Sequence, residues 1–359
     1  MDIDLLVDVL RQRIDSSLTY NLITHSLHTI AQLYNISEEE MYGMIIALLD
    51  ANYCYSTPNV WNETFENTST TDFLNSYKTD LKICKTFNHL IPQKSQNVIR
   101  FMTYNVHFWT DPSGKKTFDK FVTHIKNLQP DIIGLQEVLI PGPHSRHSHS
   151  SLGWSIKNTF SPLYKMGYKI KSCGASKTAS LGQTSFGNVL ASSLPIVSSD
   201  FFILDTPQEP RCVIIGEIKL PDGQNILIVI VHLDVYDLTG KTRRRQLKMV
   251  FERIDSYGNL PTIIMGDFNS LKYDDYSFSE KEWLKRNSQG NVDYETIEML
   301  KTKGFQDVFE RPLKYTVWTG RRVDYIFGRN FPYKVSGTYI YYSDSSDHLP
   351  LIADINLEK

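Results

Sequence analysis

The second part of the sequence places a polar or ionisable residue at the end of several apolar runs. These residues are Asn105 after FMTY, Glu137 after IIGLQ, His232 after IVIV, Asp267 with Asn269 after IIMG, and Asp347 with His348 before LPLIADI. Carboxylates are ligands for a hard cation, amides and imidazoles bind phosphate oxygens, and His/Asp pairs control protons. The set therefore predicts metal-assisted chemistry at a phosphate group.

The stretch TIIMGDFNS shows why the spacing matters. Asp267 and Asn269 are two residues apart, and alternation along an extended segment sends both side chains to the same side. The carboxylate can then activate a water while the amide bonds a phosphoryl oxygen. The alternative for Gly266 and Asp267 alone is a hairpin turn, since both are common turn residues. The functional interpretation therefore depends on several strand-end residues converging.

Short apolar segments bounded by loops carry these residues. From Asn97 onward, the segments that read as strands are VIRFMTYNV, DIIGLQEV, VIIGEIKL, NILIVIVHLDV, TIIMGDFNS, VDYIFGR and LIADINL. Apolar residues at helical spacing predict two helices, one with Phe118, Phe121, Val122 and Ile125, the other with Leu247, Val250, Phe251 and Ile254. Many strands with few helices predict packed sheets covered by outer helices.

The N-terminal residues show a different sequence pattern from the strand-rich region that follows. Ser37 and Glu40 form a capping box ahead of apolar residues at helical spacing. Residues 1–54 are therefore predicted to be a helical region that serves for packing or for binding a protein partner. Residues 55–97 begin with a stretch rich in Ser, Thr, Asn and Pro and are predicted to be a linker or an irregular segment. Residues 98–359 form the predicted main domain.

Charge, cysteine spacing and the absence of a targeting segment limit the possible functions and locations. Lys and Arg total 38 against 40 Asp and Glu, so no bulk charge draws the chain of 359 residues to nucleic acid or to an anionic membrane. The four cysteines are widely spaced without a C-x-x-C pair, which argues against a disulfide framework or a zinc site and favours a reducing compartment. With no secretory signal and no apolar run long enough to span a bilayer, an intracellular protein of the cytoplasm or nucleus is expected.

Six short motifs in order carry a resemblance to a known family. They are TYN, LQEV, VHLD, GDFN, RRVDYIF and SDH. Together they resemble the endonuclease/exonuclease/phosphatase superfamily, also called DNase I-like, over residues 98–359. The resemblance implies an α+β fold in which two packed, mainly antiparallel sheets are flanked by helices in a four-layer α/β/β/α sandwich.

The same resemblance implies roles for the individual residues. Glu137 would be the main ligand of Mg²⁺, with Mn²⁺ as an alternative, and Asn105 and Asp347 would lie beside the metal. The implied catalytic residues are His232, Asp267, Asn269, Asp324 and His348. Asn188, in SFGNVLASS, matches a position that faces the substrate. Asp324 is assigned to orienting His348 and Asp347 to the metal, although these two roles could be exchanged.

The implied activity is that of a metal-dependent phosphodiesterase that acts on nucleic acid through a metal- and Asp267-activated water. RRQLKMVFERI and the helical N-terminal region add a slight resemblance to tyrosyl-DNA phosphodiesterase 2-like members. His107 stands where abasic-site endonucleases carry a carboxylate, which argues against a second metal ligand there. The alternatives are an inositol-phosphate phosphatase, a sphingomyelinase-like enzyme or a non-catalytic scaffold. Aromatic stacking with scattered Lys and Arg would favour nucleic acid, and an exposed hydrophobic loop would favour lipid.

Overall fold

The computed structural model describes residues 85, 88, 91–141, 159–177, 184–204, 209–276, 281, 284–285, 292–309, 316–317 and 321–357. The predicted helical region at 1–54, with Ser37 and Glu40, and most of the predicted linker at 55–97 lie outside these residues. That division of the chain stays a prediction. No helix within the described ranges is both long and apolar enough to cross a membrane.

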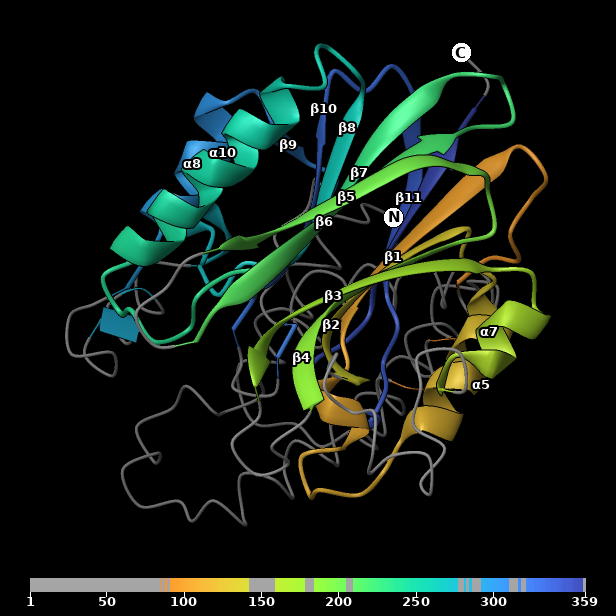
Figure 1. Ribbon diagram of the computed structural model, residues 1–359, viewed down its shortest axis with the longest axis horizontal. Coiled ribbons are helices and arrows are strands. Elements are labelled where there is room, and N and C mark those ends of the chain that lie inside the picture. Colours follow the sequence, from red (N-terminus) through yellow and green to blue (C-terminus); the bar gives the residue numbers. More distant parts are fainter. Residues whose placement is uncertain are drawn as a thin grey trace, which may run out of the picture. The chain divides into compact units, whose positions relative to one another are not determined.

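The described strands form two six-stranded sheets (Figure 1). The first sheet, in the order β11-β12-β1-β2-β4-β3, contains β1 (Val98–Asn105), β2 (Ile132–Pro141), β3 (Lys169–Lys177), β4 (Thr184–Ser192), β11 (Lys334–Ile340) and β12 (Leu351–Asn356). The second sheet, in the order β5-β6-β7-β8-β10-β9, contains β5 (Ile196–Leu204), β6 (Arg211–Lys219), β7 (Asn225–His232), β8 (Thr262–Asp267), β9 (Gln306–Asp307) and β10 (Asp324–Arg329).

Helices cover the outer face of each sheet (Figure 1). Helices α5 (Phe118–Leu128) and α7 (Ser161–Lys165) pack on the first sheet, and α8 (Lys241–Asp255) and α10 (Glu295–Thr302) pack on the second. The two predicted apolar stripes are the buried faces of α5 and α8. Two short 3-10 helices, η4 (His107–Trp109) and η5 (Tyr273–Asp275), follow β1 and β8. The predicted four-layer α/β/β/α sandwich is confirmed.

The inner faces of the two sheets approach closely. A Cβ added to Gly134 of β2 would lie 2.6 Å from Cδ1 of Ile230 and 3.1 Å from Cε of Met265 in the second sheet. A real side chain at Gly134 would therefore push the sheets apart, and the glycine permits the contact. This packing brings strands from distant parts of the sequence to one place.

One parallel pair lies within each described sheet, β1 with β2 and β7 with β8, and the other described pairs are antiparallel. Parallel pairing brings the carboxyl ends of both strands to the same edge. In the first sheet Asn105 lies opposite Gln136, next to Glu137, and in the second His232 lies opposite Asp267. The parallel pair in each sheet therefore places Asn105 beside Glu137 and His232 beside Asp267.

The structure corrects the expectation that the cysteines form no disulfide. Cys173 of β3 and Cys212 of β6 form a disulfide with their Cα atoms 6.2 Å apart, and it joins the two sheets. The two residues are 39 positions apart, and only the packing of one sheet on the other brings them together. The prediction of a reducing compartment drew on the absence of such a pair and loses that support.

Candidate active site

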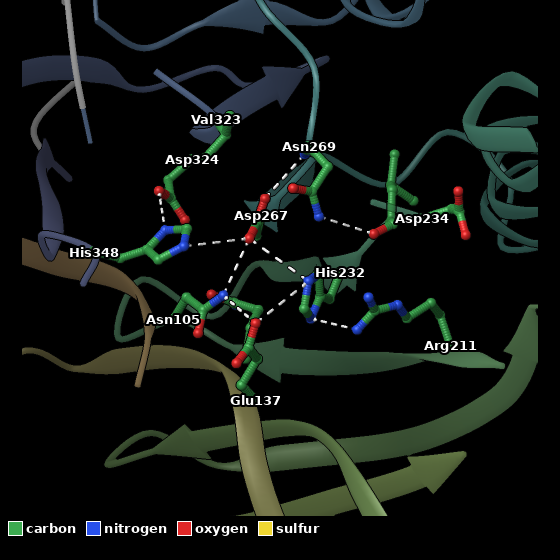
Figure 2. Close-up of polar contacts among 12 residues, drawn as sticks. Asn105, Glu137, Arg211, His232, Asp234, Asp267, Asn269, Val323, Asp324 and His348 are labelled. Carbon is green, nitrogen blue, oxygen red and sulfur yellow. Dashed lines mark hydrogen bonds and ion pairs between the residues drawn. The ribbon is translucent and has the colours of Figure 1, made fainter. Parts of the chain in front are cut away.

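Asp267 lies at the centre of the converging residues (Figure 2). Its Oδ2 accepts a hydrogen bond of 3.0 Å from Nδ2 of Asn105, and the same Nδ2 donates to Oε1 of Glu137, also at 3.0 Å. The Oδ1 of Asn105 accepts from the backbone N–H of His107 at 3.1 Å. That bond fixes which way the amide faces, so Asn105 bridges two carboxylates from different sheets.

Asp324 and His348 form a buried pair beside Asp267. Oδ2 of Asp324 accepts from Nδ1 of His348 at 2.8 Å, which is the contact predicted between them. Thr316 Oγ1 donates to the same Oδ2 at 2.6 Å. Burial lowers the pKa of His348, but the Asp324 carboxylate outweighs it and holds that pKa well above its usual range. The imidazole is therefore a cation at neutral pH, with Nε2 3.8 Å from Oδ2 of Asp267.

The charge of Asp267 is finely balanced. Burial, together with the nearby Asp324 carboxylate, raises the pKa of Asp267 to about 7, against the opposing influence of His348. The backbone N–H of Asn269 donates to Oδ1 of Asp267 at 2.9 Å and leaves Oδ2 facing the other groups. A carboxylate with a pKa near neutrality can accept a proton and release it again, as a general base must.

His232 is held as a neutral imidazole by a residue that the sequence reasoning missed. Nη1 of Arg211 lies 3.2 Å from Nδ1 of His232. Because a guanidinium can only donate, Nδ1 must accept and the ring proton resides on Nε2. Burial and the positive charge of Arg211 hold the pKa of His232 well below its usual range. The protonated Nε2 lies 3.6 Å from Oδ2 of Asp267 and 3.9 Å from Oε1 of Glu137 (Figure 2).

Arg211 is itself built into the wall of the site. It is 4% exposed, its Nη2 pairs with Glu209 at 2.9 Å, and its guanidinium lies 4.9 Å from the ring centroid of Phe186. Its Nε has no hydrogen-bond partner among the described residues. The sequence signal was an arginine at the first position of the apolar strand RCVIIGEI, where burial demands a specific partner.

The chain turns sharply at Glu137 and aims its carboxylate at the site. The pairing of β2 with β4 shifts register between Leu135 and Val138, as at a β-bulge, and Glu137 has a left-handed φ of 54°. A bulge redirects a side chain out of the regular alternation. Burial raises the pKa of Glu137, against the hydrogen bond from Asn105, and the nearby charge of Asp347 raises it further.

Asp347 lies near Glu137, and its charge raises the pKa of that carboxyl. Its Oδ1 accepts from Oγ of Ser346 at 3.2 Å and lies 3.7 Å from Nδ1 of His107. Ser346 Oγ also bonds the backbone oxygen of Asn105 at 2.8 Å, which ties this loop to the end of β1. The loop thus holds Asp347 near Glu137 although the two like charges repel.

The donor set fits a hard divalent cation. Glu137 and Asp347 are both partly exposed carboxylates, and burial together with the charge of Asp347 disfavours the charged form of Glu137, a cost that a cation with oxygen preference would offset. Donor atoms of Asp267, Asp324 and His348 also lie within 4.8 Å of one another. The direct bond between Asp324 and His348 uses two of those donors, so Glu137 and Asp347 fit better.

The two remaining predicted residues differ in position. Asn269, with a left-handed φ of 47°, is half-buried beside Asp267, and its Nδ2 donates to the backbone oxygen of Leu233 at 3.1 Å. Asn188 is 1% exposed, and its Nδ2 donates to the backbone oxygen of Cys212 at 2.7 Å. Asn188 therefore bonds the second sheet and stands apart from the polar network around Asp267.

Solved structures with the same fold support the architecture. The structure is similar to an endonuclease/exonuclease/phosphatase from Beutenbergia cavernae DSM 12333, with 19% identity, a TM-score of 0.57 and coverage of 73% of this chain and 72% of that one. A family protein from Leptotrichia buccalis C-1013-b has 18% identity, a TM-score of 0.55 and coverage of 72% and 100%. ANGEL2, a 2′,3′-cyclic phosphatase, has 16% identity, a TM-score of 0.51 and coverage of 73% and 96%.

No curated protein sequence matches the chain. The sequence model of the endonuclease/exonuclease/phosphatase family, whose members hydrolyse phosphate esters, matches residues 102–348, so the chain belongs to this family.

Proposed function

We propose that the chain is a divalent-metal-dependent phosphodiesterase that hydrolyses phosphate ester bonds in nucleic acid, with Mg²⁺ as its ion and Mn²⁺ as an alternative. One observation carries the proposal: Asp267 lies within 3.6 Å of Nε2 of His232 and 3.8 Å of Nε2 of His348, next to the Glu137 and Asp347 carboxylates. A carboxylate base, one cationic imidazole, one neutral imidazole and a set of oxygen ligands thus lie close together.

Each residue has a task in the attack of water on phosphorus. Glu137 and Asp347 would hold the divalent ion, which would supply Lewis-acid polarisation of a phosphoryl oxygen. Asp267 accepts the proton of the attacking water, because its pKa near 7 leaves it available as a base. The His348 imidazolium bonds a non-bridging oxygen and stabilises the charge that develops there. The neutral Nε2–H of His232 donates to a second oxygen.

Aromatic side chains next to the site support nucleic acid as the substrate. The ring centroid of Phe108 lies 5.5 Å from that of Phe186, and Phe186 lies 6.1 Å from the ring of His232. Phe108 is half-buried, so part of its ring is free to stack on a base of a nucleic acid strand. His107, Phe108 and Trp109 all have left-handed φ values, a costly conformation that the buried Trp109 helps to hold.

A phospholipid or an inositol phosphate is the second candidate substrate. One observation favours it: the loop after β7 exposes the apolar side chains of Val235, Tyr236 and Leu238. An exposed apolar loop beside an active site suits an enzyme that works at a lipid surface. The Asp267 mechanism applies unchanged to either ester.

The test is hydrolysis by the purified full chain across a panel of phosphate esters. The panel contains single- and double-stranded DNA, an abasic duplex, a 5′-tyrosyl oligonucleotide, poly(A) RNA, inositol polyphosphates and sphingomyelin, each with Mg²⁺ and with EDTA. Chelator-sensitive cleavage of nucleic acid that is lost in His348→Ala and Asp267→Asn is expected. Cleavage restricted to the inositol or lipid substrates would establish the second candidate. Full activity of Asp267→Asn would refute the mechanism.

A further inference from the structure

Three apolar side chains protrude from the turn that follows β7. Val235 is 44% exposed, Tyr236 is 51% exposed and Leu238 is 52% exposed. We call these three residues the apolar turn. Single exposed apolar residues are normal on a soluble protein, but three within four positions form a patch of the kind that marks an interaction site.

Hydrogen bonds hold the backbone of the apolar turn in one shape. Asp237, in its middle, accepts from the backbone N–H and the hydroxyl of Thr239 at 2.9 and 2.6 Å and from the backbone N–H of Thr242 at 2.6 Å. The N–H of Asp237 donates to Oδ1 of Asp234 at 2.7 Å. The exposed side chains therefore stand on a fixed support, and little backbone order has to be gained when they bind something.

A basic helix face adjoins the apolar turn. Lys241, Arg245 and Lys248 are exposed on α8, and their spacing of four and three residues places them on one side of the helix. We call them the basic face. Within the described ranges none of the three makes an ion pair, whereas the neighbouring Arg243 and Arg244 are paired with Asp293 at 2.7 and 3.2 Å. The three charges are therefore available to an anionic partner.

Both features lie at the active-site end of the second sheet. The apolar turn begins three residues after His232, and the backbone oxygen of Leu233 between them accepts a hydrogen bond from Asn269. Helix α8 starts directly after the turn, at Lys241. A partner bound to this surface would therefore stand beside the catalytic residues.

We propose that the apolar turn and the basic face together dock the enzyme on an anionic phospholipid surface. Apolar side chains at a fixed tip can enter the boundary between headgroups and acyl chains, while lysine and arginine beside them meet the lipid phosphates. A nucleic acid strand would use the basic face but would leave the aliphatic Val235 and Leu238 exposed to water. The charge complementarity and the apolar tip jointly fit a bilayer, whichever ester the enzyme cleaves.

The experiment is vesicle co-sedimentation of the full chain with phosphatidylcholine alone and with phosphatidylcholine plus phosphatidylserine. Binding to the anionic vesicles, weakened by salt, is expected. The triple variants Val235→Ser/Tyr236→Ser/Leu238→Ser and Lys241→Gln/Arg245→Gln/Lys248→Gln should each reduce the partition coefficient about tenfold or more. The matched control is Val197→Ser/Phe201→Ser/Ile203→Ser on β5, whose side chains are 53%, 58% and 44% exposed, and it should bind like the parent.

Other outcomes would overturn the proposal. They are no binding to anionic vesicles, equal loss in the β5 control, loss of single-stranded DNA binding in the turn variant with vesicle binding intact, or a dimer that the turn variant dissociates. Failure here is distinguishable from failure of the proposed function. His348→Ala should lose turnover and still bind vesicles, and the turn variant should hydrolyse a soluble ester such as bis(p-nitrophenyl) phosphate at the parent rate.

Discussion

Nδ1 of His348 donates a 2.8 Å hydrogen bond to Oδ2 of Asp324, and both side chains are at least nine-tenths buried. This single bond sets three properties of His348. It fixes the orientation of the ring, it turns Nε2 toward Asp267, and it keeps the imidazole protonated in a place where burial alone would remove the proton. The catalytic value of His348 therefore depends on a residue that does not reach the substrate.

Replacement of Asp324 by asparagine tests that dependence. Asp324→Asn keeps the size of the side chain but removes the negative charge, so the pKa of His348 should fall and its cationic form should be lost near neutrality. We expect kcat to drop by about 10²- to 10⁴-fold with a small change in KM. NMR titration of the His348 ring and steady-state kinetics measure the two effects.

The control for this variant is Asp255→Asn, which removes a half-exposed carboxylate paired with Arg329 at 3.1 Å. It should leave both kcat and the His348 titration unchanged, because the carboxylate is half exposed and pairs with an arginine that contacts neither Asp324 nor His348. An unchanged pKa of His348 in Asp324→Asn would contradict the assignment of Asp324 as the orienting residue.

The metal assignment is tested at Glu137. Glu137→Gln retains the shape and removes the charge, so the Mg²⁺ concentration for half-maximal activity should rise at least about tenfold. Calorimetric titration of Mg²⁺ gives a second readout that needs no turnover. Glu217→Gln is the control. Glu217 is a carboxylate on β6 that takes no part in the site and accepts a 2.7 Å hydrogen bond from Asn225. Equal Mg²⁺ affinity in Glu137→Gln and the parent would refute the assignment.

Arg211 should act through His232. In Arg211→Gln the positive charge beside the ring is gone, so the pKa of His232 should rise from its depressed value, and Nδ1 loses its obligatory donor. We expect a loss of kcat of about 10- to 100-fold, as for other residues that orient a functional histidine. The pH profile should shift as well, which a purely structural defect would not cause.

Arg253→Gln provides the matched control for Arg211. Arg253 also lies over a phenylalanine, 5.6 Å from the ring of Phe202, and also pairs with a carboxylate, Asp200, but it is exposed on α8. Its replacement should leave the pH profile unaltered. Indistinguishable profiles for Arg211→Gln and the parent would show that His232 keeps its tautomer without help.

His124 predicts a stability change at acid pH. Its ring is buried, with Nε2 2.6 Å from Oγ of Ser343, and burial lowers the pKa of His124 from 6.5 to about 4. As pH falls from 7 to 5 the unfolded chain takes up a proton at this residue and the folded chain does not. The free energy of unfolding should therefore fall by about 2 kcal/mol through His124 alone.

Urea unfolding of the parent and of His124→Gln at pH 7 and pH 5 measures this difference. All other titrating groups are shared, so they cancel in the comparison. The variant should lose about 2 kcal/mol less than the parent over this pH range. Parallel losses in the two proteins would mean that His124 is protonated in the folded state.

Part of the fold followed from local pattern. Helices α5 and α8 were predictable because their apolar residues recur at helical spacing, and β7 and β8 because each contains an unbroken apolar run. Strands β3, β4, β5, β9 and β11 were not predicted. The strand KIKSCGASK is rich in polar residues, and β5 is largely exposed at a sheet edge, so neither shows the apolar run that marks a buried strand.

The same division holds for the site. Glu137, Asp267 and His348 were identifiable because each interrupts or borders an apolar run with a group suited to phosphate chemistry. Arg211, Thr316 and Ser346 were not. Each matters because of its partner elsewhere in the chain. Arg211 contacts His232, 21 positions away, Thr316 contacts Asp324, 8 positions away, and Ser346 contacts Asn105, 241 positions away. A local pattern contains no information about such partners.

The sequence by itself determined the kinds of groups and the strands that end in them, because residue type and hydrophobic period are local properties. Only the tertiary structure decided which groups meet. The bond between Asp324 and His348 and the disulfide of Cys173 and Cys212 depend on one sheet packed against the other. The contact that sets the tautomer of His232 and the approach of Asp347 to Glu137 depend on the order of strands within one sheet. Protonation is decided there as well, because burial and neighbouring charges act through space and not along the chain.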